Sequence, residues 1–272
     1  MPFSLRAYYI SHIMRRMKSK KFYSVAKIIG AFVILLALCA SGVMFFHTYY
    51  YELIYVSGGS MYPTLNKKAN SEDAETVGSI VDFGIIDTHS AALKNIKRFD
   101  IISTYYPDST DYNLDTNTLR PGAKKKIKRI IALPNETFKI EKGLLYILRN
   151  GEFELEPYSF KTNPDVSTGY TGKDTKIDEP IKLGDNQYWV LGDNRSASRD
   201  CATIGQPIMY ENIIGVLVAI EGYGKLYAKN YVCDNCGKKF SIKGGNTCSN
   251  CQSPLKIEYD INHKQYQWPK FF

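Results

Sequence analysis

Residues 56–65 read VSGGSMYPTL, a stretch in which two glycines precede Ser60 and a proline stands three residues after it. Glycine lets a backbone approach a substrate closely and adopt positive φ, whereas Pro63 fixes its own φ and favours an extended Tyr62. The stretch therefore predicts a rigid turn that exposes the Ser60 hydroxyl beside free backbone amides, as a nucleophilic serine requires. Gly-Gly-Ser alone is typical of an ordinary loop, so the nucleophile interpretation depends on the other motifs of the chain.

Positive charge is concentrated at the N-terminus. The chain of 272 residues has a formal net charge of +8, and seven lysine and arginine residues with no acidic residue lie within residues 1–27. The rest of the chain is therefore close to neutral. A protein that binds nucleic acid usually spreads its basic side chains over a folded domain, so we expect no nucleic-acid partner.

An apolar run follows this basic segment. Residues 28–46, IIGAFVILLALCASGVMFF, carry no charged side chain and are long enough to cross the ~30 Å hydrocarbon core of a bilayer. They predict one transmembrane helix over residues 28–48, an anchor in the cell membrane. Because the basic residues precede it, we expect residues 1–27 in the cytoplasm and everything beyond residue ~50 outside. A cleaved signal peptide is the alternative, but its basic and apolar regions are usually shorter.

Lys128 is the candidate general base. Residues 126–136 read KIKRIIALPNE, and in a strand alternate side chains share a face, so Lys128 would lie with Ile130 and Ala132 while Arg129 points the opposite way. A free lysine with a pKa near ~10.4 is protonated at neutral pH and cannot accept a proton. Burial among aliphatic side chains would lower that pKa. A surface strand in a basic patch is the competing interpretation.

Two further segments complete a set of four motifs. Residues 99–106, FDIISTYY, have the β-branched and aromatic composition of a strand, and residues 187–191 predict another strand that runs into GDNRSASRD at 192–200. In this order the four motifs resemble the boxes of type I signal peptidases, the serine–lysine proteases that cut signal peptides from exported proteins. The resemblance spans about residues 20–222.

The resemblance implies a role for each site residue. Ser60 would be the nucleophile and Lys128 the base of a dyad, and no histidine near the motifs offers an alternative triad. The Ser60 amide would hold the oxyanion, and Gly58 stands where some family members have a serine donor. The supporting residues would be Ser198, which orients the lysine in the family, together with Asp193, Arg195 and Asp200.

This chain departs from the family pattern at several positions. The departures are Phe99 and Ala132 for glycines, Asn135-Glu136 for Gly-Asp, and Cys201-Ala202 for Ser-Arg. Asn tolerates the left-handed conformation, so we expect the turn at Asn135 to survive. Ala202 removes the arginine that would pair with Asp200, and Arg199 is a candidate to replace it.

Four cysteines near the C-terminus form two C-x-x-C pairs. Their spacing predicts a tetrahedral zinc site in a ribbon over residues 229–256, with Cys233, Cys236, Cys248 and Cys251 as ligands. Two disulfides are the alternative, because the expected outer location permits them. The Gly222-Tyr223-Gly224 sequence predicts a domain boundary before the ribbon. We therefore expect the ribbon to be separable, and cleavage to survive truncation after residue ~224.

Together these features predict a mainly β protein with one N-terminal transmembrane helix, a signal-peptidase-like catalytic domain of antiparallel β-sheet over residues 52–224, and a small C-terminal zinc ribbon. The expected function is removal of signal peptides from secreted preproteins at the surface of the lipid bilayer. We expect catalysis to need no cofactor and zinc to be structural. The alternatives are a serine–lysine protease that cuts itself or one partner, and an inactive membrane adaptor.

Overall fold

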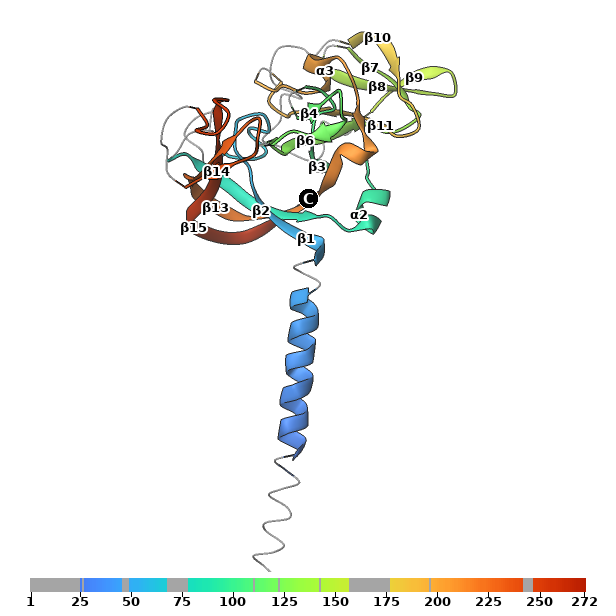
Figure 1. The fold of residues 1–272 in the computed structure, drawn as a ribbon. Helices are drawn as coiled ribbons and strands as arrows, with labels where there is room; N and C mark the ends of the chain where they lie inside the picture. Colours follow the sequence, from blue (N-terminus) through green and yellow to red (C-terminus); the bar gives the residue numbers. More distant parts are fainter. Residues whose placement is uncertain are drawn as a thin grey trace, which may run out of the picture. The chain divides into compact units, whose positions relative to one another are not determined.

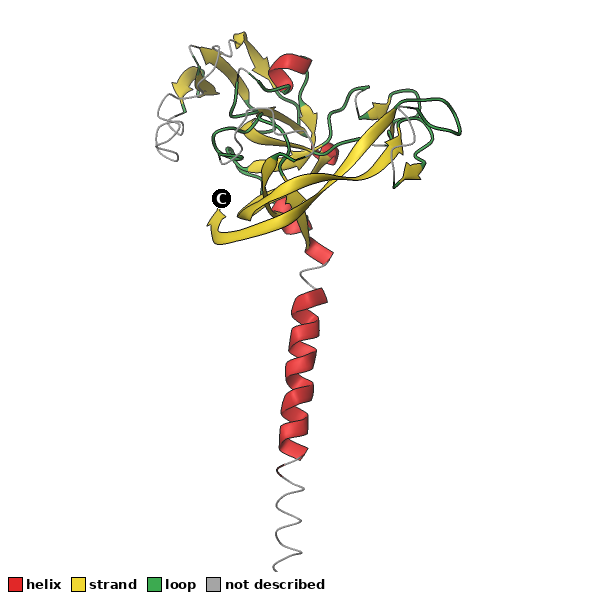
Figure 2. Cartoon of the chain, turned by 90° about the vertical axis from the view of Figure 1, so that its left-hand side faces the viewer, coloured by secondary structure: helices red, strands yellow, loops and turns green. Residues whose placement is uncertain are grey.

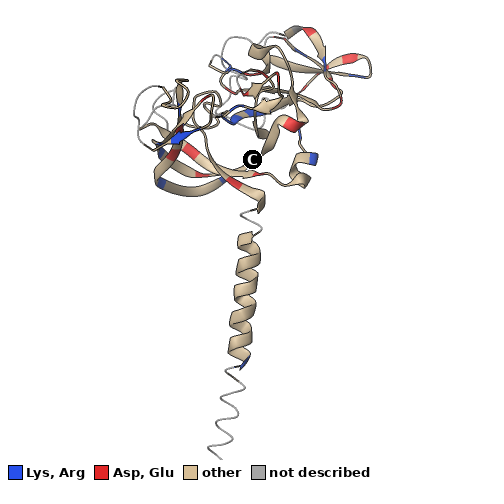
Figure 3. Ribbon diagram, in the orientation of Figure 1, with Lys and Arg blue, Asp and Glu red and all other residues tan. Residues whose placement is uncertain are grey.

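The computed structural model describes residues 25, 27–45, 49–67, 78–109, 111–121, 123–141, 143–156, 177–195, 197–241 and 247–272. The chain forms two compact units, residues 1–50 and 51–272. The first contains the helix Lys27–Phe45, which is long and apolar enough to cross a membrane and which carries almost no charge (Figure 3). The predicted basic segment lies almost entirely outside the described residues, as do residues 46–48 of the predicted span.

The second unit is mainly β, as predicted (Figure 1). Its large antiparallel sheet has the order β1-β2-β13-β3-β6-β11-β12, with β14 and β15 paired to β13, and β10-β7-β8-β9 form a smaller sheet. The strands of the large sheet are β1 (Tyr51–Tyr55), β2 (Ile80–Asp87), β3 (Ile101–Thr104), β6 (Lys126–Ala132), β11 (Gln187–Leu191), β12 (Ile208–Met209), β13 (Ile213–Cys233), β14 (Lys239–Phe240) and β15 (Leu255–Phe271). The smaller sheet has β7 (Thr137–Glu141), β8 (Leu144–Arg149), β9 (Glu152–Leu155) and β10 (Ile177–Lys182), and the remaining elements are β4 (Tyr112–Asn113), β5 (Thr118–Leu119), α2 (Ser90–Lys94), α3 (Cys201–Ile204) and the 3₁₀ turn η3 (Tyr210–Asn212).

Local turn chemistry explains two of the connections. The β8–β9 hairpin turns at Asn150 (φ 51°) and Gly151 (φ 87°), which have the positive φ values of a type I′ turn. Asn135 has φ 67°, so it occupies the left-handed conformation expected of it. Phe99 has φ 75°, a conformation that a bulky residue rarely adopts and that glycine adopts readily.

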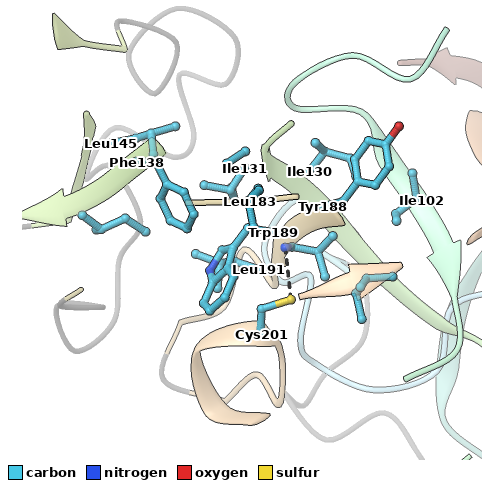
Figure 4. Close-up of a cluster of buried hydrophobic side chains, with 14 of the residues drawn as sticks. Ile102, Ile130, Ile131, Phe138, Leu145, Leu183, Tyr188, Trp189, Leu191 and Cys201 are labelled. Carbon is cyan, nitrogen blue, oxygen red and sulfur yellow. Dashed lines mark hydrogen bonds between the residues drawn. The ribbon is translucent and has the colours of Figure 1, made fainter. Parts of the chain in front are cut away.

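The largest hydrophobic cluster lies between the two sheets and helix α3. Phe138 from β7 packs against Trp189 from β11, with ring centres 5.4 Å apart, and Ile130 from β6 is fully buried. Figure 4 shows these side chains around Cys201, whose sulfur accepts a hydrogen bond from the Val190 amide at 3.3 Å. Burial raises the pKa of this thiol to about 12, so Cys201 behaves as a core residue.

The boundary expected at Gly222–Gly224 is wrong. β13 runs without interruption from Ile213 to Cys233, and β15 pairs with it along most of its length (Figure 2). The glycine is needed for close packing, because a Cβ on Gly222 would lie 2.1 Å from the backbone oxygen of Gln265. Leu226 and Ile261 of this hairpin pack on Phe83 of β2. Truncation after residue ~224 would therefore uncover part of the core, and the expectation that cleavage survives it is withdrawn.

Candidate active site

The loop that carries Ser60 is held from inside by Asn66. The Asn66 side-chain amide donates to the backbone oxygens of Val56 at 2.6 Å and Gly58 at 3.0 Å, while its own oxygen accepts from the Asp82 amide at 2.7 Å. Gly58 has φ 87°, which confirms the need for glycine at this position. The loop is thus tied to β2, and buried hydrogen bonds of Asn66 set the course of the backbone that leads to Ser60.

A second asparagine ties the loop to the segment after β11. The Asn194 amide donates to the Ser60 oxygen at 3.0 Å, and its side chain donates to the Gly59 oxygen at 3.1 Å. Within the described part of the chain, the Ser60 amide donates to no acceptor, so it is available for an oxyanion. Asn66 and Asn194 were not assigned roles from the sequence. The only signal was their position, since Asn194 lies within the motif at 192–200 and Asn66 directly follows the motif at 56–65.

Lys128 meets Ser60 at the centre of the site. Its Nζ lies 2.8 Å from Oγ of Ser60 and 3.1 Å from the Ile127 oxygen, and its side chain is only 3% exposed. Burial lowers the pKa of Lys128 to about 8, an effect that Lys126 reinforces and that Asp200 and Asp193 oppose. The competing interpretation of a surface strand does not hold, because both faces of β6 are covered from Lys128 onward.

Arg129, on the other face of β6, forms a buried ion pair with Asp193. Its Nε and one terminal nitrogen donate to the two carboxylate oxygens at 2.8 and 2.6 Å, and its other terminal nitrogen donates to the Phe99 oxygen at 2.8 Å. Burial alone would raise the pKa of Asp193, but Arg129 outweighs it and, with Arg195 nearby, holds this pKa below its usual value. Asp193 therefore braces the segment that carries Asn194.

Asp200 keeps its place without an arginine. One carboxylate oxygen accepts from the Gly192 amide at 2.9 Å and the other from the Ala202 amide at 3.2 Å, which caps helix α3. The replacement expected of Arg199 is wrong, because Arg199 forms an ion pair with Asp108 at 2.7 Å. Two backbone amides, of Gly192 and Ala202, therefore hold the carboxylate of Asp200 in place.

Ser198 does not make the contact expected of it. Its hydroxyl is buried and has no hydrogen-bond partner in the described part of the chain, whereas Lys128 contacts Ser60 and Ile127. The hydroxyl packs against Gly192, where an added Cβ would lie 2.2 Å from it and 2.4 Å from the Ser60 oxygen. Ser198 is therefore close to the nucleophile's backbone, and the small size of Gly192 makes this possible.

The four C-terminal cysteines converge at the end of the β13–β15 hairpin. All four sulfur atoms lie within 4.8 Å of one another, with Cys233 3.3 Å from Cys251 and Cys236 3.7 Å from Cys248. A zinc ion with ligand bonds of about 2.3 Å in tetrahedral geometry separates its sulfurs by about 3.8 Å. All four cysteines are free thiols, so the donor set fits one ion.

Comparison with known proteins adds an independent line of evidence. The family described as signal peptidase, peptidase S26 matches residues 25–220. Signal peptidase I V of Bacillus subtilis is 32% identical over 142 residues, which cover 50% of this chain and 73% of that protein. Signal peptidase I S of the same organism is 32% identical, covering 53% of this chain and 62% of that protein. A signal peptidase I structure from Enterococcus faecalis is 28% identical over 45% of this chain and 97% of that chain, with a TM-score of 0.31.

Proposed function

Since this chain belongs to the peptidase S26 family of type I signal peptidases and is a serine endopeptidase, we propose that it removes signal peptides with a dyad of Ser60 and Lys128. The observation that carries this proposal is the 2.8 Å contact between Oγ of Ser60 and the buried Nζ of Lys128. The family match supports an enzyme over an inactive adaptor.

The proposed reaction uses Lys128 in its neutral form. Nζ accepts the Ser60 proton as Oγ attacks the scissile carbonyl, and the free Ser60 amide stabilises the oxyanion. Lys128 then gives the proton to the leaving amine, which leaves an acyl-enzyme. Lys128 next takes a proton from water as the water oxygen attacks the ester carbonyl, and then gives this proton to Oγ of Ser60 as the ester bond breaks and the acid product leaves.

The direct test is incubation of the detergent-solubilised full chain with a secreted preprotein. We expect the signal peptide to be cut from the wild-type reaction and to stay attached with Ser60→Ala. Equal cleavage by the two proteins would show that Ser60 is not the nucleophile.

The pH profile tests the state of Lys128. Because the base must be neutral, kcat/KM should rise with pH and level off above about 8, the pKa to which burial lowers the Lys128 ammonium. Lys126→Gln should move the midpoint to higher pH, because the Lys126 charge helps to lower the pKa of Lys128. Steady-state kinetics from pH 6 to 10 measures both. A profile that is flat through this range would contradict the assignment of Lys128 as base.

We further propose a membrane location with residues beyond ~50 outside the cytoplasm. The helix Lys27–Phe45 and the exposed aromatic side chains of Trp268 and Phe271 support it, since aromatic residues favour the bilayer interface. A protease added to cells with an opened outer envelope should digest residues beyond ~50 and spare the N-terminus. A reporter fused after Phe272 that proves cytoplasmic would contradict this orientation.

A structural zinc ion in the cysteine cluster completes the proposal. The fit of four thiolates within 4.8 Å supports it. We expect one Zn²⁺ per full chain by native mass spectrometry and loss of the ion in Cys236→Ser with Cys248→Ser. Two disulfides among the four cysteines, with no bound metal, would contradict the zinc assignment.

A further inference from the structure

A groove lies beside the nucleophile loop, between the first strand and the cysteine-bearing hairpin. It has a volume of about 610 Å³, and its lining includes Ile54 of β1 and Ile127 of β6 together with Val232 of β13 and Ile257 and Tyr259 of β15. Pockets of about 300–1,000 Å³ are the size that holds organic ligands. The volume therefore allows a short stretch of extended peptide.

The groove is lined by residues that stand close in the chain to Ser60 and Lys128. Ser57, which lines it, stands three residues before Ser60, and Ile127 precedes Lys128. The Ile127 oxygen lies 3.1 Å from Nζ of Lys128. A chain that occupies the groove would therefore lie next to the reacting bond.

One buried hydroxyl in the groove has no partner. Ser103 of β3 is fully buried and lines the groove, yet its Oγ makes no hydrogen bond within the described part of the chain. An unsatisfied buried hydroxyl costs about 1–3 kcal/mol. A peptide group of a bound chain offers the acceptor or donor that Ser103 lacks, which favours a peptide as occupant.

The hairpin side of the groove lies beyond the part of the chain that matches the family. The family match ends at residue 220, whereas Val232, Ile257 and Tyr259 lie beyond it. The hairpin lysines that line the groove, Lys229, Lys239 and Lys256, form ion pairs with Asp260, Glu258 and Asp234 respectively. The positive charge on the hairpin side of the groove is thus largely neutralised, so its apolar side chains are the groups that would contact a ligand.

We infer that the cysteine-bearing hairpin is part of the substrate-binding site, and that the segment of the preprotein beside the scissile bond binds between β1, β6 and this hairpin. The inference rests on the proposed function. The cysteine cluster closes the hairpin next to the groove, because Cys233 follows Val232 and pairs in register with Leu255. Metal binding would therefore hold the hairpin side of the groove in place, and its loss would weaken substrate binding.

Binding to an inactive protein tests the inference separately from cleavage. The full chain carrying Ser60→Ala is titrated with a fluorescent peptide that spans the signal-peptide cut site, with anisotropy as the signal. Adding Tyr259→Ala or Ile257→Ala should raise Kd at least fivefold, and removing the metal with a chelator should do the same. Tyr227→Ala is the matched control, because this tyrosine is on β13 of the same hairpin but does not line the groove.

Kinetics of the active protein gives the second readout. Tyr259→Ala should raise KM for a preprotein at least fivefold and leave kcat and the pH midpoint unchanged. An unchanged Kd in the groove variants would overturn the inference. A fall in kcat at constant KM would also overturn it, because it would indicate that the hairpin only stabilises the fold of the active site and does not contact the substrate. If the wild-type chain fails to cut any preprotein, the proposed function fails, while the binding titration still decides whether a peptide occupies the groove.

Discussion

Alanine in place of Ser60 or Lys128 is expected to lower kcat for preprotein cleavage by about 10⁴- to 10⁶-fold, the loss seen when a nucleophile or its base is removed. The 2.8 Å contact between the two side chains makes them one unit. The double variant should therefore be no slower than either single variant. Single-turnover kinetics, which separates chemistry from product release, measures the effect.

Two further substitutions at Lys128 distinguish loss of the base from loss of the fold. Lys128→Arg should be inactive because a guanidinium stays protonated. Lys128→Met keeps a long unbranched side chain and removes a buried amine, so it should be inactive but at least as stable as the wild type. Lys139→Met on β7 is the control for lysine loss and should keep full activity. Measurable turnover by Lys128→Arg would refute the dyad.

The contact between Ser60 and Lys128 could be anticipated from sequence because each residue lies in a short contiguous motif. The run around Ser60 specifies its own turn through Gly58, and the alternation of β6 separates Lys128 from Arg129. The mainly β fold was predictable for the same reason, since the motifs fall on strands of β-branched and aromatic residues. Turn-forming residues and alternation along a strand are properties of one short segment, so they can be recognised without knowing which other segments it contacts.

The residues that brace the site depend on contacts between distant segments, and there the sequence was a weaker guide. Arg199 stands beside Asp200 in the sequence, yet it pairs with Asp108, from a loop about ninety residues earlier. Asn66 and Asn194 donate hydrogen bonds to backbone oxygens of the loop before Ser60, and a sequence motif does not reveal contacts with backbone atoms. The glycines at 222–224 resembled a boundary because the strand that packs against them, β15, comes forty residues later. Pairing partners of this kind are visible only in three dimensions.

Breaking the buried ion pair between Arg129 and Asp193 should give the largest loss of stability in the catalytic unit. Both side chains are at most 10% exposed, and removal of one partner leaves a buried charge without its counterion. Such a loss costs about 3–5 kcal/mol, so Arg129→Met should lower Tm by roughly 10 °C for a unit of this size. Thermal unfolding of the detergent-solubilised full chain, followed by tryptophan fluorescence, to which the buried Trp189 contributes, measures it.

The same pair predicts how stability changes with pH. Arg129 holds the pKa of Asp193 below its usual value in the folded state, so the pair stabilises the protein above the unfolded pKa of about 3.9 and this contribution is lost as pH falls through the folded value. Arg129→Met should therefore differ most from the wild type near neutral pH and least in acid. The control is Arg149→Met, which breaks ion pairs with Glu154 and Glu156 made by a side chain that is itself 40% exposed, each worth about 0–1 kcal/mol. If Arg129→Met and Arg149→Met lower the free energy of unfolding by the same amount, the buried pair of Arg129 and Asp193 is worth no more than an exposed pair. That result would contradict the role of the buried pair in holding the segment before Asn194.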